Sequence, residues 1–386
     1  MKTITVLGST GSIGCSTVDL LCQVPDEVSV RCLVGGRNVR LLAEQARKVR
    51  AERAVIADDG ALEELRGLLA GSGIEASAGR QAVIEAAAVP ADWTMAAITG
   101  AAGLEPTLAS IRNGRAVALA NKEALVCAGD VMLRAVKAAG ATLLPVDSEH
   151  NAIAQAMADR QADQVEKIIL TASGGPFRCS TLEEMEKAPP SAALKHPTWT
   201  MGAKITIDSA SMFNKGLEVI EAARLFDLTE DRIDVLVHPQ SAVHGLVQYT
   251  DGSLIAQIGS ADMRIPIAHC LAWPKRMPTT SPRLDLAALA TLTFEAPDEV
   301  RFPALRLARQ ALRDGGAASD ILSAANEIAV EAFLAGRIGF LDIARIVERV
   351  MECLGHPALE TLEDVLHWDA EARREAGRLV VQRAAA

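Results

Sequence analysis

Short apolar runs rich in β-branched residues alternate with segments of helical periodicity over the first part of the chain. Between these runs, apolar residues recur at helical spacing, for example over residues 41–50 and 125–139. Such alternation predicts βαβ units, which build a doubly wound parallel sheet with helices on both faces. The predicted strands cover residues 3–7, 28–34, 53–57, 95–99, 116–120 and 142–146.

Later apolar runs predict a second sheet of different kind. Asp251-Gly252 separates two of these runs and is typical of a tight hairpin turn. We therefore expect a mixed or antiparallel sheet, with strands at residues 232–237, 245–250 and 253–258. A further strand is predicted at residues 166–171. The prolines that cluster beyond it, at Pro274, Pro278 and Pro282, indicate a linker.

The remainder of the chain is predicted to be helical. Apolar residues recur there at helical spacing, and only short loops separate the segments. Short connections favour antiparallel neighbours, so a small helical bundle is expected from residues 303–313, 320–334, 341–354 and 359–378.

Composition narrows the class of protein. With 386 residues, 49% hydrophobic and 23% charged, the chain fits a soluble globular protein of more than one domain. A net charge of -10 argues against a nucleic-acid or anionic-membrane partner, although a local basic pocket for a phosphate remains compatible. The 7 scattered cysteines include no CxxC pair and predict reduced thiols. No apolar stretch is long enough to span a bilayer, and we expect a cytoplasmic protein.

A glycine-rich turn follows the first predicted strand. Gly8-Ser-Thr-Gly-Ser-Ile-Gly14 lies between that strand and a helical pattern. Strand, glycine turn and helix in this order suit a dinucleotide pyrophosphate at a helix N-terminus. The spacing is GxxGxxG rather than GxGxxG, so a plain tight turn remains the alternative.

The second predicted strand ends in Gly35-Gly-Arg-Asn38, where an NAD site would place an acidic residue. Arg37 suits the 2′-phosphate of NADP instead, since its planar guanidinium can pair with two phosphate oxygens. A solvated surface arginine is the alternative reading.

Polar residues follow two further predicted strands at their carboxyl ends, where ligands of such sheets bind. One group is Asn121-Lys122-Glu123, for which a helix-start role competes with a site role. The other contains Asp147 and Glu149, whose side chains would point the same way in an extended segment while Ser148 faces elsewhere. The carboxylates would supply hard oxygen ligands for a cation, with Glu218 as a distant third ligand. Alternatively, Asp147 and Glu149 cap a helix that starts near Ala152.

Two later stretches have the composition of a substrate pocket. Residues 195–204 contain His196 and, between Pro197 and Gly202, Trp199. This composition predicts a lid, with a static Ω-loop as the alternative. Residues 208–216 gather hydroxyl, amide and ammonium donors suited to a phosphate. His238 and His244 are interpreted as structural histidines.

Taken together, these motifs closely resemble the 1-deoxy-D-xylulose 5-phosphate reductoisomerase family over almost the entire chain. In chain order they are Gly8-Ser-Thr-Gly-Ser-Ile-Gly14, Asn121-Lys-Glu123, Asp147-Ser-Glu-His-Asn151, Ser173-Gly-Gly-Pro-Phe177, Lys195-His-Pro-Thr-Trp199 and Asn214-Lys-Gly-Leu-Glu218. The resemblance implies an NADPH-dependent enzyme of the non-mevalonate isoprenoid pathway. It would rearrange and reduce the ketose phosphate to 2-C-methyl-D-erythritol 4-phosphate, typically as a homodimer.

The resemblance also carries residue roles onto this sequence. Metal ligands fall on Asp147, Glu149 and Glu218, which with Lys122 form the expected catalytic set. Substrate contacts fall on Lys122, Ser148, Glu149, Ser173, His196, Ser209, Asn214, Lys215 and Glu218. Cofactor contacts fall on Thr10, Gly11, Ser12, Ile13, Gly36, Arg37, Asn38, Asn121, Glu123 and Gly202. Ala203 departs from the family pattern, which has a basic residue there.

The chemistry implied is consistent with the residue types. All-oxygen ligands suit Mg²⁺ or Mn²⁺, which polarise a carbonyl and stabilise an enolate or alkoxide. Lys122 would add positive charge or transfer a proton. An NADP-dependent dehydrogenase of another phosphorylated sugar or alcohol would need the same nucleotide domain but has less use for three metal carboxylates. A non-catalytic nucleotide sensor would have no use for Lys122, the carboxylates and the phosphate pocket together.

The expected fold is α/β, with an N-terminal Rossmann-like doubly wound parallel sheet, a central α+β catalytic domain and a C-terminal small helical bundle. We predict the NADPH-binding domain at residues 1–146 and the catalytic domain, with metal site, substrate site and lid, at 147–274. A linker at 275–299 and the bundle at 300–386 follow.

Overall fold

The computed structural model describes residues 1–157, 162–199 and 201–384. Their contacts divide the chain into two compact units, each built from several segments. Unit 1 comprises Met1–Ala124, Met132–Asn151 and Asp262–Pro282. Unit 2 comprises Leu125–Val131, Ala152–Ala261 and Arg283–Ala386. The chain therefore passes between the units more than once.

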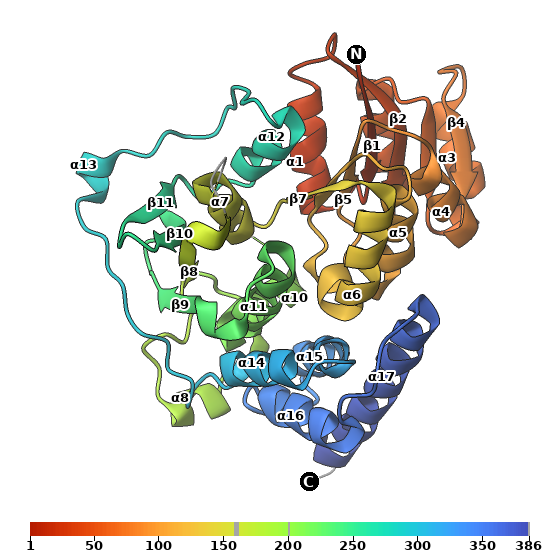
Figure 1. Cartoon of the computed structure of the whole chain (residues 1–386). Helices are drawn as coiled ribbons and strands as arrows, with labels where there is room; N and C mark the ends of the chain where they lie inside the picture. The colour runs from red at the N-terminus through yellow and green to blue at the C-terminus, as the bar shows by residue number, and fades with distance from the viewer. Residues whose placement is uncertain (158–161, 200, 385–386) are drawn as a thin grey trace. The chain divides into compact units, whose positions relative to one another are not determined.

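Unit 1 contains a 7-stranded parallel sheet (Figure 1). Its order is β4-β3-β2-β1-β5-β6-β7, so the direction of winding reverses between β1 and β5. This confirms the predicted doubly wound sheet, and the reversal is where such sheets bind ligands. The strands are β1 (Lys2–Leu7), β2 (Val28–Gly35), β3 (Arg53–Ile56), β4 (Glu75–Ala78), β5 (Trp93–Ala96), β6 (Ala116–Leu119) and β7 (Thr142–Pro145).

Successive strand residues of unit 1 contribute to two separate apolar clusters, because side chains alternate between the faces of a sheet. In β3, Ala54 and Ile56 belong to one cluster and Val55 to the other. The first cluster is completed by α1 (Ser12–Leu21), α2 (Val39–Lys48), α3 (Leu62–Leu69) and α12 (Arg264–Ala272). The second is completed by α4 (Arg80–Ala88) and α5 (Leu104–Ile111).

Unit 2 contains a 4-stranded sheet of order β11-β10-β8-β9. Strand β10 is antiparallel to both neighbours, whereas β8 and β9 are parallel, so the predicted mixed sheet is confirmed. The predicted hairpin joins β10 to β11. The strands are β8 (Val165–Ala172), β9 (Ile233–Val237), β10 (Val243–Tyr249) and β11 (Leu254–Ile258).

Helices cover this sheet and continue into the predicted bundle. Helix α11 packs on β8, β9 and α14, and α15 lies among α10, α14, α16 and α17. One apolar cluster joins the sheet to these helices, so sheet and bundle share a core. The longer helices are α10 (Ala203–Ser211), α11 (Phe213–Phe226), α14 (Ala304–Asp314), α15 (Ala318–Leu334), α16 (Asp342–Leu354) and α17 (Leu362–Ala384). The shorter elements of the chain are η1 (Asp59–Ala61), η2 (Ala101–Gly103), η3 (Ala162–Gln164), α8 (Leu182–Glu186), α9 (Pro190–Ala193), η4 (Glu230–Arg232) and α13 (Leu286–Leu289).

Several local predictions were wrong. The segment around Asp147 is not extended through Glu149, because α7 (Ser148–Met157) begins directly after Asp147 rather than near Ala152. Likewise the loop predicted at 195–204 ends at Gly202, since α10 begins at Ala203. Strand β4 was not predicted. Helix α6 (Lys122–Ala139) begins three residues earlier than expected, so that Lys122 and Glu123 form its first turn.

In the part of the chain that the structure describes, every helix is too short or too polar to cross a lipid bilayer.

Candidate active site

The glycine turn of unit 1 follows β1 at the point where the strand order reverses. Gly8 has a φ of +86°, and a Cβ there would overlap the carbonyl of Ala97 after β5. A Cβ on Gly14 would overlap the backbone of Gly8 and Ser9, so α1 can begin close against the turn only with glycine at this position. The N-terminus of α1 is thus presented at the end of β1, where a pyrophosphate binds in folds of this kind.

Arg37 lies just after β2, and its side chain is exposed. Asn38 caps α2, with its side-chain oxygen accepting the backbone N–H of Leu41 at 3.2 Å. The guanidinium is therefore free to meet a ligand from solvent, as the predicted contact with a 2′-phosphate requires.

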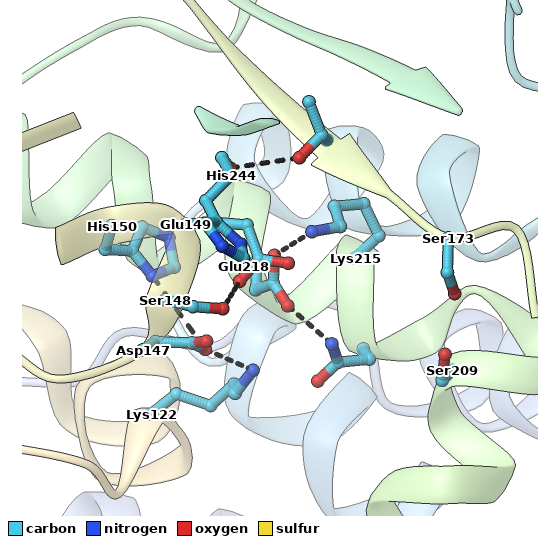
Figure 2. A network of polar contacts seen from close by, with 12 residues as sticks. Lys122, Asp147, Ser148, Glu149, His150, Ser173, Ser209, Lys215, Glu218 and His244 are labelled. Atoms are coloured by element: carbon cyan, nitrogen blue, oxygen red, sulfur yellow. Dashed lines mark hydrogen bonds and ion pairs between the residues drawn. The ribbon is translucent and has the colours of Figure 1, made fainter. Parts of the chain in front are cut away.

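Asn121 and Lys122 follow β6 and are almost completely buried, with 1% and 6% of their surface exposed. The Asn121 side chain accepts from the N–H of Ala124 at 3.3 Å and donates to the carbonyl of Gly100 at 3.1 Å. Asn121 thus starts α6 and also ties it to the loop after β5. Lys122 forms an ion pair with Asp147, so the ends of β6 and β7 are joined by opposite charges (Figure 2).

The residues after β7 form the second half of this edge. The Ser148 hydroxyl hydrogen-bonds the Glu149 carboxylate, so the prediction that Ser148 faces elsewhere was wrong (Figure 2). His150 is fully buried, with Nδ1 3.9 Å from Asp147 Oδ2. Two carboxylates at the start of α7 are favoured by the helix dipole, which attracts negative charge to a helix N-terminus.

In unit 2, the first two turns of α11 carry a buried charged cluster. Glu218 is 0% exposed and Lys215 is 3% exposed. One carboxylate oxygen of Glu218 accepts from the Asn214 amide and the other from the Lys215 ammonium (Figure 2). A carboxylate buried to this extent needs a positive partner, which Lys215 supplies.

His196 links two hydroxyls that were predicted to contact substrate. Its Nε2 lies 3.0 Å from the Ser173 hydroxyl and 3.1 Å from the Ser209 hydroxyl. Its Nδ1 accepts backbone N–H groups of Thr198 at 3.1 Å and Trp199 at 2.9 Å. Since Nδ1 is an acceptor, the ring proton is on Nε2, and burial lowers the pKa of His196 in agreement with a neutral ring.

Because Nε2 carries the ring proton, His196 is the donor toward the Ser173 and Ser209 oxygens. The protons of these two hydroxyls are therefore available to an anion. Ser173 already accepts the backbone N–H of Gly175 at 3.2 Å, which fixes its oxygen. Ser173, His196 and Ser209 are therefore brought together by the structure, as are Asn214, Lys215 and Glu218. Within unit 1, it brings together Lys122 and Asp147.

The expected lid lies only partly within the described residues, because Thr200 falls outside them. Trp199 is half-buried, and its ring centroid lies 6.2 Å from that of His244. Gly202 is the N-cap of α10, and Ala203 is its first residue. His244 also presents its backbone carbonyl to the Thr171 hydroxyl at 3.0 Å (Figure 2).

Two further buried polar residues lie beside these motifs: Glu221, which was not singled out from the sequence, and His244, which was interpreted as a structural histidine. Glu221 is 0% exposed and lies one turn after Glu218 on α11, and His244 is 7% exposed on β10. The i, i+3 spacing of Glu218 and Glu221 was a usable signal, because it places both carboxyls on one face of a helix. His244 carries no such local signal.

The chain matches three family models. The model of 1-deoxy-D-xylulose 5-phosphate reductoisomerase matches residues 4–129, and that of its C-terminal domain matches residues 143–226. A model of the DXP reductoisomerase C-terminal domain matches residues 258–375.

Whole-chain relatives agree with these models. The 1-deoxy-D-xylulose 5-phosphate reductoisomerase of Gluconobacter oxydans is 73% identical, covering 96% of this chain and 91% of its own. A solved structure of the Zymomonas mobilis reductoisomerase in complex with NADPH has a TM-score of 0.94 and 54% identity, covering 98% of this chain and 99% of its own. A DOX-P reductoisomerase in complex with NADPH, fosmidomycin and magnesium has a TM-score of 0.93 and 41% identity, covering 99% and 98%. The chain belongs to the 1-deoxy-D-xylulose 5-phosphate reductoisomerase family.

Proposed function

We propose that this protein rearranges 1-deoxy-D-xylulose 5-phosphate and reduces it with NADPH to 2-C-methyl-D-erythritol 4-phosphate. The observation that carries the proposal is the carboxyl edge of the unit 1 sheet. A nucleotide turn follows β1, and the ion pair between the buried Lys122 and Asp147 joins the ends of β6 and β7 of the same sheet. A nucleotide-binding protein without chemistry has no need for a buried lysine and carboxylates at that edge.

Asp147, Glu149 and Glu218 are the proposed ligands of a divalent cation, Mg²⁺ or Mn²⁺. Their fit rests on their chemistry, since all three are carboxylates and hard oxygen donors suit these ions. When bound, such a cation polarises the substrate's carbonyl and hydroxyl oxygens and stabilises negative charge on them. Lys122 forms an ion pair with Asp147 and Lys215 with Glu218, so each of these two carboxylates already faces a positive charge.

The substrate phosphate is proposed to bind the hydroxyl pair held by His196, together with Asn214 and Lys215. Because the His196 ring proton is on Nε2, both Ser173 and Ser209 can turn their own protons toward phosphate oxygens. Hydrogen bonds to an ionised phosphate are stronger than those between neutral groups. The neutral imidazole thus orients the phosphate contacts without adding charge.

Lys122 is proposed to act on the reacting oxygens, either by its charge or by moving a proton at Nζ. The remaining expected substrate contacts, Ser148 and Glu149, sit in the first turn of α7 and keep each other oriented. NADPH supplies the hydride, and its pyrophosphate would lie at the N-terminus of α1, beside Thr10, Gly11, Ser12 and Ile13. Arg37 would pair with its 2′-phosphate.

We also propose that the protein is a homodimer, built through unit 2. Strand β11 is an edge strand with one side unpaired among the described residues. Leu254 and Ile258 on it are 51% and 41% exposed, and exposed apolar edges of this kind serve as pairing surfaces. A cytoplasmic location is proposed because every cysteine, including the exposed Cys179 and Cys353, is a free thiol.

An NADPH oxidation assay tests the proposed reaction. Oxidation should require both deoxyxylulose phosphate and Mg²⁺, and chelation with EDTA should stop it. A phosphonate that carries a hydroxamate should inhibit by occupying the phosphate pocket and chelating the ion. Equal affinity of that inhibitor for metal-free and metal-loaded enzyme would contradict the proposed arrangement.

A further inference from the structure

Helix α6 is broken one turn and a half after Lys122. Ala128 has φ −111° and ψ 27°, which are not helical values, although helix continues on both sides. A break leaves carbonyl oxygens of the preceding turn without their usual N–H partners. Those oxygens must be satisfied by another group if they are shielded from water.

Arg224, near the end of α11, supplies that group. Its Nη1 donates to the carbonyl oxygens of both Leu125 and Val126. These are carbonyls of the turn that leads into the break. Burial lowers the pKa of the Arg224 guanidinium, while the nearby Asp130, Cys127 and Asp320 act in the opposite sense.

Gly129, the residue after the break, makes room for this contact. A Cβ on Gly129 would overlap Cδ and Nε of Arg224. The φ of Gly129 is not in the left-handed region, so its backbone does not require glycine. Alanine would be the better helix former at such a position. The close approach of the Arg224 side chain is therefore what requires the absence of a side chain at residue 129.

We infer that Arg224 is a positioning residue for the reaction: it holds the break in α6 and thereby sets the direction of the first turn, which carries Lys122. The inference rests on the proposed function, since it assigns Arg224 a role through Lys122. Arg224 meets α6 at the carbonyl oxygens of Leu125 and Val126 and beside Gly129. Displacing the first turn of a helix by a fraction of a turn moves a side chain on it by an ångström or more, and such shifts lower turnover by about a hundredfold in well-oriented sites.

The test uses two variants that disturb the contact in different ways. Arg224→Met removes the donor but keeps an apolar chain of similar length, and Gly129→Ala pushes the guanidinium away while improving helix propensity. Both should lower kcat by about ten- to a hundredfold while the Mg²⁺ concentration for half-maximal activity stays within about twofold. Both should also speed hydrogen exchange of backbone amides in residues 122–131, a readout independent of activity.

Arg232→Met is the matched control. Arg232 also donates to two consecutive backbone carbonyls, but these belong to Val165 and Glu166 at the start of β8. Its loss should leave kcat and the exchange of residues 122–131 unchanged. In a Lys122→Ala background, Arg224→Met should cause no further loss of rate, because the residue through which it acts is already gone.

Wild-type kcat and unchanged exchange in Gly129→Ala, or an equal loss of rate from Arg224→Met with and without Lys122, would overturn the inference. If Arg224→Met does not fold, the Gly129→Ala and Arg224→Lys variants test the inference instead. Arg224→Lys should retain intermediate activity, because its ammonium supplies a single donor group. Absence of turnover in the wild-type enzyme would instead refute the proposed function. Hydrogen exchange would still show whether Arg224 holds the break.

Discussion

Charged residues of the candidate site are buried in pairs, and this determines how they respond to substitution. Lys215 and Glu218 are both almost fully buried, as is Lys122 beside Asp147. Removing one partner leaves an uncompensated buried charge, which destabilises a fold by several kcal/mol. Asn and Gln variants keep the shape of the carboxylate but leave the partner lysine uncompensated, so the free energy of unfolding is measured beside the activity of each variant.

Arg37→Asp should change cofactor preference at the residue scale. The exposed guanidinium is proposed to pair with the 2′-phosphate of NADPH, a group that NADH lacks. Loss of a charged hydrogen bond should weaken the binding of NADPH by about 1.5–3 kcal/mol, which raises its Kd about ten- to a hundredfold. Fluorescence titration with both cofactors checks this. Equal weakening of NADPH and NADH would remove the assignment.

Asp320→Asn should change how stability depends on pH. Burial, followed by the nearby Asp369 carboxylate, raises the pKa of Asp320 to about 8, while Cys127, Arg373 and Arg224 lower it. The native state therefore keeps a proton that the unfolded state releases above about pH 4, so this group's contribution to stability falls as pH rises toward 8. Between pH 6 and pH 8, the free energy of unfolding of the wild type should fall by about 2 kcal/mol more than that of Asp320→Asn.

Urea unfolding at both pH values measures that difference. The histidines whose pKa burial lowers, His196 and His269, are present in both proteins, so their effect cancels. Asp364→Asn serves as the control. Backbone hydrogen bonds from Thr361 and Glu360 lower the pKa of Asp364, so its contribution changes only in acid. Parallel pH dependence of wild type and Asp320→Asn would contradict the prediction.

At the scale of elements, the start of each helix decides where site residues point. The sequence analysis offered a helix starting near Ala152 only as an alternative, and it predicted no helix over residues 203–211, where α10 lies. Asp147 and Glu149 read as an extended pair by spacing, yet Glu149 lies in the first turn of α7 because the helix dipole and the Ser148 hydroxyl stabilise a carboxylate there. Strand β4, Glu-Ala-Ser-Ala, has no β-branched residue and forms only through pairing with β3.

Trp199→Ala tests whether the segment before α10 acts as a lid. An enolate intermediate must be kept from water, and an indole offers a large apolar cover. The variant should lower the rate of the rearrangement by about tenfold or more. The rate at which it reduces the authentic aldehyde intermediate with NADPH should fall less. Trp199→Phe, which keeps an aromatic cover, should retain most activity.

Trp199 fluorescence should also change when inhibitor enters, against the background of Trp93, Trp273 and Trp368. An unmoved signal, together with equal rates of limited proteolysis with and without inhibitor, would make the segment a static wall.

At the scale of the whole molecule, the order of the strands could not be read from their sequence. The doubly wound sheet, the mixed sheet and the helical bundle were predicted correctly because periodicity is a local property. Long-range contacts are not local. The segment Asp262–Pro282 belongs to unit 1, where the Trp93 indole donates to the Cys270 carbonyl at 3.0 Å. The sequence of residues 262–282 alone does not predict this contact. The predicted domain boundaries stay a prediction.

Variants of Asp147 and Glu218 test the proposed metal ligands. Asp147→Asn and Glu218→Gln should each lower metal-dependent turnover by more than about a hundredfold, because a lost carboxylate ligand weakens both ion binding and charge stabilisation. NADPH affinity should stay nearly unchanged. Glu331→Gln, at an exposed position on α15, is the control and should be fully active. Full activity of either variant would show that the substituted residue is not a metal ligand.

The carbon skeleton of the product tests the proposed rearrangement most directly. Deoxyxylulose phosphate labelled with ¹³C in its chain should be incubated with the enzyme, NADPH and Mg²⁺, and the product examined by NMR. The product should be branched, 2-C-methyl-D-erythritol 4-phosphate, and formed in equal amount to the NADPH consumed. An unbranched sugar alcohol phosphate, produced by reduction without rearrangement, would contradict it.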